Sequence, residues 1–185
     1  TAPNPPIGVH FDVWVKDDEK TLRELRKDRE KEAEEKGKSI AYPSVEELRK
    51  EDTEEESFIL CRIEDMQGNV VRKLKLPAKK GMKRVWWDGR YAPVEPINFR
   101  NFDPSNVYDE PERGFPAVPG DYQVSLYKYK NGNLEQISGK VQFKLETLNQ
   151  GAIPPADKIE LQKFNTSLAD TYREFLAEAQ RKNDM

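Results

Sequence analysis

The chain has 185 residues, of which 36% are hydrophobic and 35% charged, and its mean hydropathy is −0.92. This length favours one domain with appendages over two full domains, and no apolar run approaches the roughly 20 residues of a membrane-spanning helix, so we expect no membrane insertion. With 31 Lys and Arg residues against 34 Asp and Glu residues, the net charge of −3 gives no general attraction to nucleic acid.

The rarest residues exclude several kinds of active site. Cys61 is the one cysteine, so the chain forms no internal disulfide and no zinc site made of several cysteines. His10 is the one histidine, which excludes the HExxH zinc motif, and the glycine motifs that bind phosphates or dinucleotides are absent. We therefore expect no catalytic residue, no metal site and no cofactor. His10 is expected on an outer strand face, and Cys61 as a small core residue.

Residues 1–56 are expected to form an N-terminal strand and an exposed helical insertion that belong to the following β-domain. The proline-rich residues 1–6 carry neither the basic nor the apolar region of a signal peptide. Because the chain also lacks an initiating Met, we expect it to be an excised piece or a processed product, with which a targeting signal could have been lost. Apolar and polar side chains then alternate over residues 9–15, which predicts a strand with one buried face.

Two helices are predicted in the insertion. Residues 17–36 are crowded with Lys, Arg and Glu and carry few apolar side chains, which is typical of a helix on the surface. We expect Asp17 or Asp18 to be its N-cap and Gly37 to end it. A capping-box pattern at the start of residues 44–50 predicts a second, short helix.

Residues 57–150 are expected to form the core of a β-sandwich with a long loop at 90–119. Strands are predicted where β-branched and aromatic residues alternate with polar ones, and turns where Gly, Asn and Asp cluster between them. The loop holds prolines and scattered aromatic residues without periodicity, a composition often found at binding surfaces. The predicted strands cover residues 58–63, 70–76, 82–87, 122–127 and 141–145.

Residues 151–185 are predicted to form one amphipathic helix, because apolar residues recur there at spacings of three and four. Such an apolar stripe has to be buried, either against the β-sandwich or against a partner, and we favour the sandwich. The residues of the stripe are Leu161, Phe164, Leu168, Tyr172, Phe175 and Ala179.

A set of turn and core residues has a structural explanation. Gly68 supplies the positive φ of a tight turn, and Gly120 frees the backbone before the next strand. Strand alternation directs Trp87 into the core and Trp86 to the opposite face, while Asp88 caps its turn through its own side chain. The full set is Asp65, Gly68, Asn69, Gly81, Trp87, Asp88, Pro119, Gly120 and Tyr122.

The segment IEDMQGNVVRKLKLPAKKGMKRVWWDGRY, at residues 63–91, resembles the C-terminal β-sandwich module that follows sortilin-like propellers of BNR repeats in exported bacterial proteins. It is more loosely similar to the immunoglobulin-like repeat of the flagellar hook-capping protein. The shared pattern is a D-x-x-G-N turn, a K-x-G-x-x-x-V-x-W-D strand and a P-G-x-Y strand. The flanking segments NPPIGVHFDVWVKD, YPSVEELRKEDTEEE and PPADKIELQKF resemble the same module in the same order.

The resemblance implies a mainly β fold: an immunoglobulin- or fibronectin-III-like β-sandwich with an N-terminal charged helix and a C-terminal amphipathic helix. It implies a non-catalytic accessory domain that docks on a β-propeller of the same polypeptide and positions it. The resemblance also places the protein outside the cytoplasm, in the periplasm, on the outer surface or secreted. Such proteins are often labelled glycosyl hydrolases, and any catalysis would then belong to the propeller.

Two other functions remain open. A carbohydrate-binding module would use exposed aromatic rings as a stacking platform, centred on the 90–119 loop and joined by Trp14. A glycosidase, or a calcium site, would need converging carboxylates from the same loop, although a solvated loop explains those acids more simply. The platform candidates are Trp86, Tyr91, Phe99, Phe102, Tyr108 and Phe115. The carboxylate candidates are Asp103, Asp109, Glu110 and Glu112.

Overall fold

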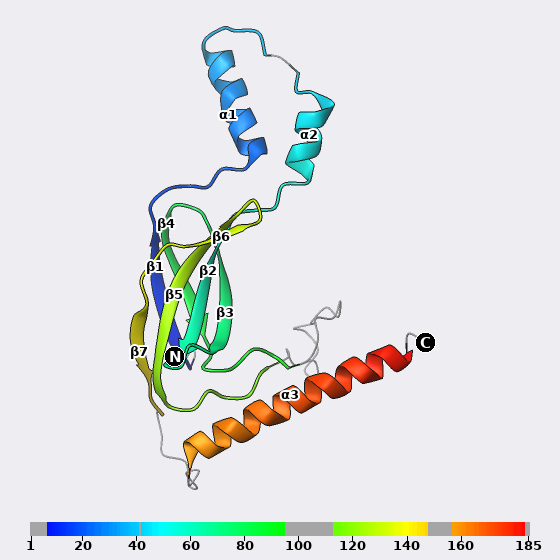
Figure 1. The fold of residues 1–185 in the computed structure, drawn as a ribbon. Helices are drawn as coiled ribbons and strands as arrows, with labels where there is room; N and C mark the ends of the chain where they lie inside the picture. Colours follow the sequence, from blue (N-terminus) through cyan, green and yellow to red (C-terminus); the bar gives the residue numbers. More distant parts are fainter. Residues whose placement is uncertain (1–6, 41, 95–112, 148–156, 184–185) are drawn as a thin grey trace, which may run out of the picture.

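The computed structural model describes residues 7–40, 42–94, 113–147 and 157–183 (Figure 1). Within these ranges the chain forms both strands and helices. The strands build two antiparallel sheets, so the fold is a mixed arrangement of two sheets and three helices. The elements are β1 (Val9–Val15), α1 (Leu22–Glu35), α2 (Val45–Asp52), β2 (Phe58–Asp65), β3 (Val70–Pro77), β4 (Gly81–Trp87), β5 (Gly120–Lys130), β6 (Asn133–Gln136), β7 (Val141–Leu145) and α3 (Lys158–Asn183).

The smaller sheet pairs β1 with β4, and the larger sheet has the order β3–β2–β5–β6. Strand β7 also pairs with β5, so the two short strands share one edge of that long strand. The β2–β3 hairpin lies where the sequence predicts it. Strand β6, which pairs with the end of β5, was not predicted. The pairing of β1 with β4 joins segments about 70 residues apart, and neither segment's own pattern reveals it.

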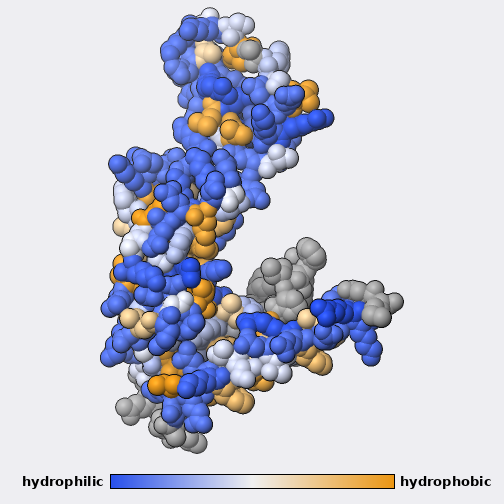
Figure 2. Space-filling view, in the orientation of Figure 1, coloured by the Kyte–Doolittle hydropathy of each residue, from blue (hydrophilic) through white to orange (hydrophobic). Residues whose placement is uncertain are grey.

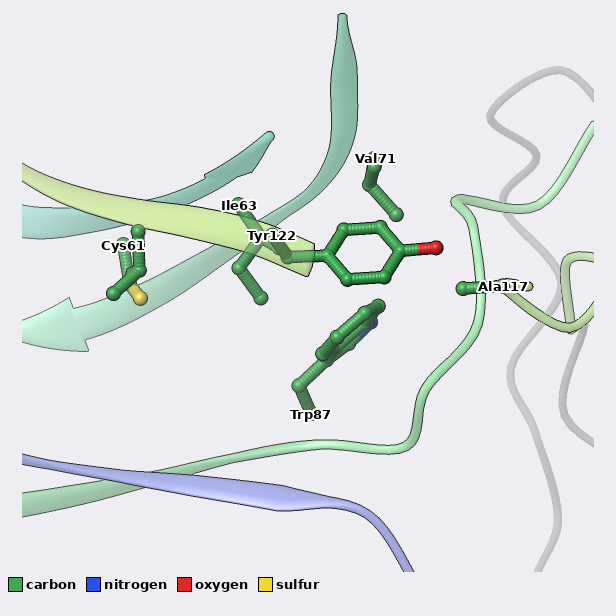
Figure 3. Packing of buried hydrophobic residues seen from close by; sticks show 7 residues of the cluster. Cys61, Ile63, Val71, Trp87, Ala117 and Tyr122 are labelled. Atoms are coloured by element: carbon green, nitrogen blue, oxygen red, sulfur yellow. The ribbon is translucent and has the colours of Figure 1, made fainter. Parts of the chain in front are cut away.

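The core lies between the inner faces of the two sheets. Trp87 from β4 has no exposed surface and meets Tyr122 from β5 edge to face, with 5.6 Å between the ring centres. Figure 3 shows these rings beside Cys61, Ile63 and Val71 of the larger sheet. Because one cluster takes its members from both sheets, burial of apolar area holds the two layers together.

The predicted alternation of β1 is confirmed, since Val13 and Val15 are buried and Trp14 between them is 64% exposed. The predicted helices are also present, but the predicted N-cap of α1 is wrong. Thr21 is the N-cap, because its hydroxyl accepts from the backbone N–H of Glu24 while the Glu24 carboxylate accepts from the backbone N–H of Thr21.

Helices α1 and α2 project beyond one end of the sheets (Figure 1). Neither helix has a buried residue, as expected for a charged surface insertion. The guanidinium of Arg26 joins them through two hydrogen bonds to Glu51, of 2.7 and 3.0 Å. Lys79 in the β3–β4 connection donates to Glu24, which ties the insertion to the sheets.

Helix α3 runs away from the sheets (Figure 1), and its packing differs from the expectation. The face turned toward the sheets contains Ala169, which is 4% exposed, and Gln162, whose side-chain amide donates to the hydroxyl of Tyr91 at 2.7 Å. The five large residues of the predicted apolar stripe stay exposed, so the favoured packing of that stripe against the sheets is wrong for most of its surface. Leu168 and Tyr172, at its edge, line a hollow together with Val94 and Phe115.

Candidate functional site

The turn between β2 and β3 is built around the carboxylate of Asp65. One carboxylate oxygen accepts the backbone N–H groups of Gln67 and Asn69 at 3.0 and 2.8 Å, and the other accepts the Asn69 side-chain amide at 2.8 Å. Gly68 has a φ of 89° in this turn. Since the turn itself engages both oxygens of a carboxylate that is 8% exposed, Asp65 has a structural role.

The residues around Trp87 also serve the fold. The indole N–H of Trp87 donates to the carbonyl of Arg90 at 2.8 Å, and Asp88 accepts from the backbone N–H of Arg90 at 3.1 Å. Gly81 begins β4 with a φ of 111°. These contacts fix the end of β4, and Asp88 caps its turn as expected.

Tyr122 stands just after Pro119 and Gly120, where β5 begins. Its hydroxyl donates to the carbonyl of Val118 at 2.5 Å, and burial raises the pKa of this phenol to about 12. The expected role of Gly120 needs correction, because its φ lies outside the left-handed region and a Cβ there would meet Val118 only at 4.0 Å. Gly120 is therefore not required by backbone conformation.

The aromatic residues proposed as a platform fall into separate places. Tyr91 and Phe115 stack on each other with ring centres 4.4 Å apart, and burial raises the pKa of the Tyr91 phenol. Trp86 points from the opposite face of β4, where it stacks on His10. The structure therefore does not join Trp86 to the Tyr91–Phe115 pair. Phe99, Phe102 and Tyr108 lie outside the described residues, as do Asp103, Asp109, Glu110 and Glu112.

Neither the cysteine nor a metal-binding cluster provides a reactive site in the described residues. Cys61 is fully buried, and burial raises the pKa of its thiol to about 11, which suppresses the reactive thiolate. Across the described ranges, no group of three His, Cys, Asp or Glu side chains could hold a metal ion. None of the helices described has the length and apolar composition needed to span a membrane.

A hollow of about 310 Å³ lies between α3 and the end of the larger sheet. Asp65 contributes its one carboxylate, which the β2–β3 turn already engages. Arg173 on α3 is paired with Asp170 at 2.9 Å. This hollow thus holds no carboxylate pair of the kind that glycoside hydrolysis requires. A larger hollow beside it, along α3, is lined by Asp65, Asp170 and Glu174. Of these three carboxylates, Asp65 is engaged by the β2–β3 turn and Asp170 is paired with Arg173.

The apolar residues of α3 form the most conspicuous feature of the described surface. Phe164, Leu168 and Phe175 are 62%, 54% and 65% exposed, and Leu161 and Tyr172 are each 41% exposed. Figure 2 shows hydrophobic colour along the lower edge of this helix. Their spacing places these five residues, here called the α3 apolar row, on one side of the helix. An exposed apolar surface of this kind is a candidate interaction site.

The outer face of the β1–β4 sheet carries a second group of exposed side chains. Asp12 and Arg84 form a doubly hydrogen-bonded pair with distances of 2.6 and 2.8 Å, which sequence reasoning missed because it depends on the long-range pairing of β1 with β4. Trp14 is exposed beside it on β1. The sequence signal for this face is the alternation of polar and aromatic residues in β1 and in β4. That alternation predicts each strand but not the register that aligns the two.

A scan against protein-family models, a search of the curated proteins and a search of the solved structures each found no match for this chain.

Proposed function

We propose that this chain is a non-catalytic interaction module that docks on a neighbouring β-propeller domain of the same exported polypeptide and positions that domain. The observation that carries the proposal is the exposed α3 apolar row. Phe164 and Phe175 each expose more than half of their surface although they belong to a regular amphipathic helix. A partner surface that covers the row would remove this apolar area from water.

The energetic reason is the cost of leaving large apolar side chains in water. Fully burying one Leu or Phe side chain contributes roughly 1.5–3 kcal/mol. Five such residues in one row offer several times that amount, part of which offsets the entropy lost on docking. An amphipathic helix laid in a groove is a recurrent binding mode and uses anchors at this spacing.

The immunoglobulin- or fibronectin-III-like identity of the two sheets belongs to the same proposal. Two features support it: the buried Trp87 between the layers and the bond from the Tyr122 hydroxyl to the backbone of Val118. A tyrosine near the start of a strand that bonds to the backbone a few residues upstream is a hallmark of immunoglobulin-type sandwiches.

The proposed β-propeller partner and the location outside the cytoplasm rest on the resemblance of residues 63–91 and their flanks to propeller-associated modules. An antibody against this chain should detect, in the source cells or their medium, a polypeptide far heavier than 21.5 kDa. It should be found in the exported fraction. A native product near 21.5 kDa would contradict the proposed neighbouring domain. A product confined to the cytoplasm would contradict the proposed export.

Site-specific photocross-linking in the native, full polypeptide tests the docking surface itself. A photoreactive benzoylphenylalanine in place of Phe175 should cross-link to peptides of the neighbouring domain. The matched control replaces Glu174, the preceding residue of the helix, which is exposed on a different side. Cross-links from position 174 as strong as those from 175, or cross-links from 175 only to this chain's own sheets, would overturn the proposed docking surface.

A further inference from the structure

The outer face of the β1–β4 sheet presents three cross-strand pairs in a ladder. The register places Trp14 opposite Met82, Asp12 opposite Arg84, and His10 opposite Trp86. Trp14 and Met82 are 64% and 62% exposed, and the Asp12 and Arg84 side chains are 39% and 63% exposed. An indole thus stands at each end of the ladder, with one pair of opposite charges between them.

The two indoles are separated along the sheet by the central ion pair. Met82, the partner of Trp14, lies four residues before Trp86 on the same strand, which corresponds to about 13 Å along the strand. That length suits a short chain molecule lying along the strands better than a single small ring.

Two parts of the ladder are already held in place. The Trp86 indole stacks on His10 with an interplanar angle of 16°, and its N–H donates to the carbonyl of Ile7 at 3.1 Å. Arg84 donates through Nε and one terminal nitrogen to the two carboxylate oxygens of Asp12. Groups that are fixed before binding lose less conformational entropy when a ligand arrives.

We infer that this face binds a neutral oligosaccharide that lies along the strands, with sugar rings against Trp14 and Trp86 and hydroxyl groups bonded to the Asp12–Arg84 pair. A sugar ring has an apolar C–H face and a rim of hydroxyl groups. The indole of Trp14, which is exposed, and the indole of Trp86, which is half-buried and stacked on His10, match the apolar face of the sugar. The Asp12–Arg84 pair matches the hydroxyl rim. The carboxylate oxygens of Asp12 keep spare lone pairs, and Arg84 keeps donors beyond the two bonds to Asp12.

The charge of this face and the arrangement of its apolar side chains favour a neutral sugar over a nucleic acid, an acidic polysaccharide or a protein. The six ladder residues carry one formal negative and one formal positive charge with His10 neutral, so the face has no excess of cations for a nucleic acid or an acidic polysaccharide. A protein partner would favour contiguous apolar area, which the α3 apolar row supplies and this face interrupts with an ion pair. The inference does not depend on the proposed docking through α3.

The test is a titration of the whole chain with neutral hexasaccharides: cellohexaose, xylohexaose, mannohexaose and chitohexaose. Binding of at least one at millimolar concentration or below should shift the amide resonances of β1 and β4 and change the tryptophan fluorescence. Trp14→Ala, and separately Arg84→Met, should each weaken that binding about tenfold or more, because each removes one kind of contact. Both side chains are exposed, so the variants should keep the fold, which their amide spectra verify.

Phe175→Ala is the matched control, because Phe175 on α3 is as exposed as Trp14 and lies on another face. It should bind the same hexasaccharide with unchanged affinity. The inference is overturned if none of the four hexasaccharides binds, or if Trp14→Ala and Arg84→Met leave binding unchanged. It is also overturned if oligogalacturonate, single-stranded DNA or a protein occupies this face more tightly than any neutral sugar.

Discussion

At the scale of single residues, the Trp87 indole fills the space between the two sheets with no exposed surface and donates its N–H to Arg90. Trp87→Ala should lower the free energy of unfolding by about 3–5 kcal/mol, because it removes a large buried side chain and leaves a cavity. Urea denaturation measures this change. Trp14→Ala on the outer face serves as the control and should change the value by about 0.5 kcal/mol or less. Equal effects of the two substitutions would contradict the assigned core.

Gly114 is required by close packing and was not singled out from the sequence. A Cβ at this position would lie 2.2 Å from the carbonyl oxygen of Tyr91, well inside contact distance. Gly114→Ala should therefore destabilise the chain by about 1–3 kcal/mol. In Gly139→Ala the new Cβ meets nothing within 4 Å, so thermal unfolding should show little change or a small gain. A Gly114→Ala protein as stable as the Gly139→Ala protein would refute this contact.

Because of Tyr122, the free energy of unfolding of the chain should depend on pH in the alkaline range. Its phenol has a pKa of about 12 in the folded chain against an ordinary value of 10, because burial disfavours the charged form. A raised pKa contributes stability that is intact below pH 10 and is lost as the pH rises toward 12, by roughly 1–3 kcal/mol. Tyr122→Phe should lose less stability over this pH window than the unmodified chain. Parallel losses in urea titrations of both proteins would exclude Tyr122 as the cause.

At the scale of elements, local patterns explain most of the chain and long-range pairing explains the rest. Alternation in residues 9–15 predicts β1, because successive side chains of a strand point to opposite faces. The cap of α1 was misplaced because Asp17 and Asp18 are good capping residues by type, whereas the reciprocal bonds between Thr21 and Glu24 decide the position.

The candidate sites show the same division between local and long-range information. The spacing of α3 predicts a helix and its apolar row, but the side of the helix that contacts the sheets depends on Tyr91 and other residues remote in sequence. Likewise, the ladder on the outer face needs the register between Asp12 and Arg84, which each segment lacks when taken alone.

The N-terminus of α1 offers a test of the capping box. Thr21→Ala should raise the rate of amide hydrogen exchange in the first turn of α1, corresponding to a local loss of about 1 kcal/mol. Global unfolding should change little, because α1 has no buried residue. Asp17→Ala should leave exchange in this turn unchanged. The opposite result, faster exchange in Asp17→Ala alone, would show that Asp17 is the N-cap, as expected from the sequence.

At the scale of the whole molecule, the chain is a sheet body with helices at both ends that add little to its core. The α1–α2 insertion has no buried residue, and among the described residues of α3 only Ala169 is buried. Combined Phe164→Ser and Phe175→Ser substitutions should therefore change the free energy of unfolding of the isolated chain by about 0.5 kcal/mol or less, measured in urea. A much larger loss would mean that the α3 apolar row already packs within this chain.

The central claim is that a partner covers the α3 apolar row in the native protein. Hydroxyl-radical footprinting compares the isolated chain with the native polypeptide, and Tyr42, which is 99% exposed, serves as the reference. Oxidation of Phe164 and Phe175, relative to Tyr42, should fall sharply in the native polypeptide. Equal oxidation of both phenylalanines in the two samples would contradict the claim.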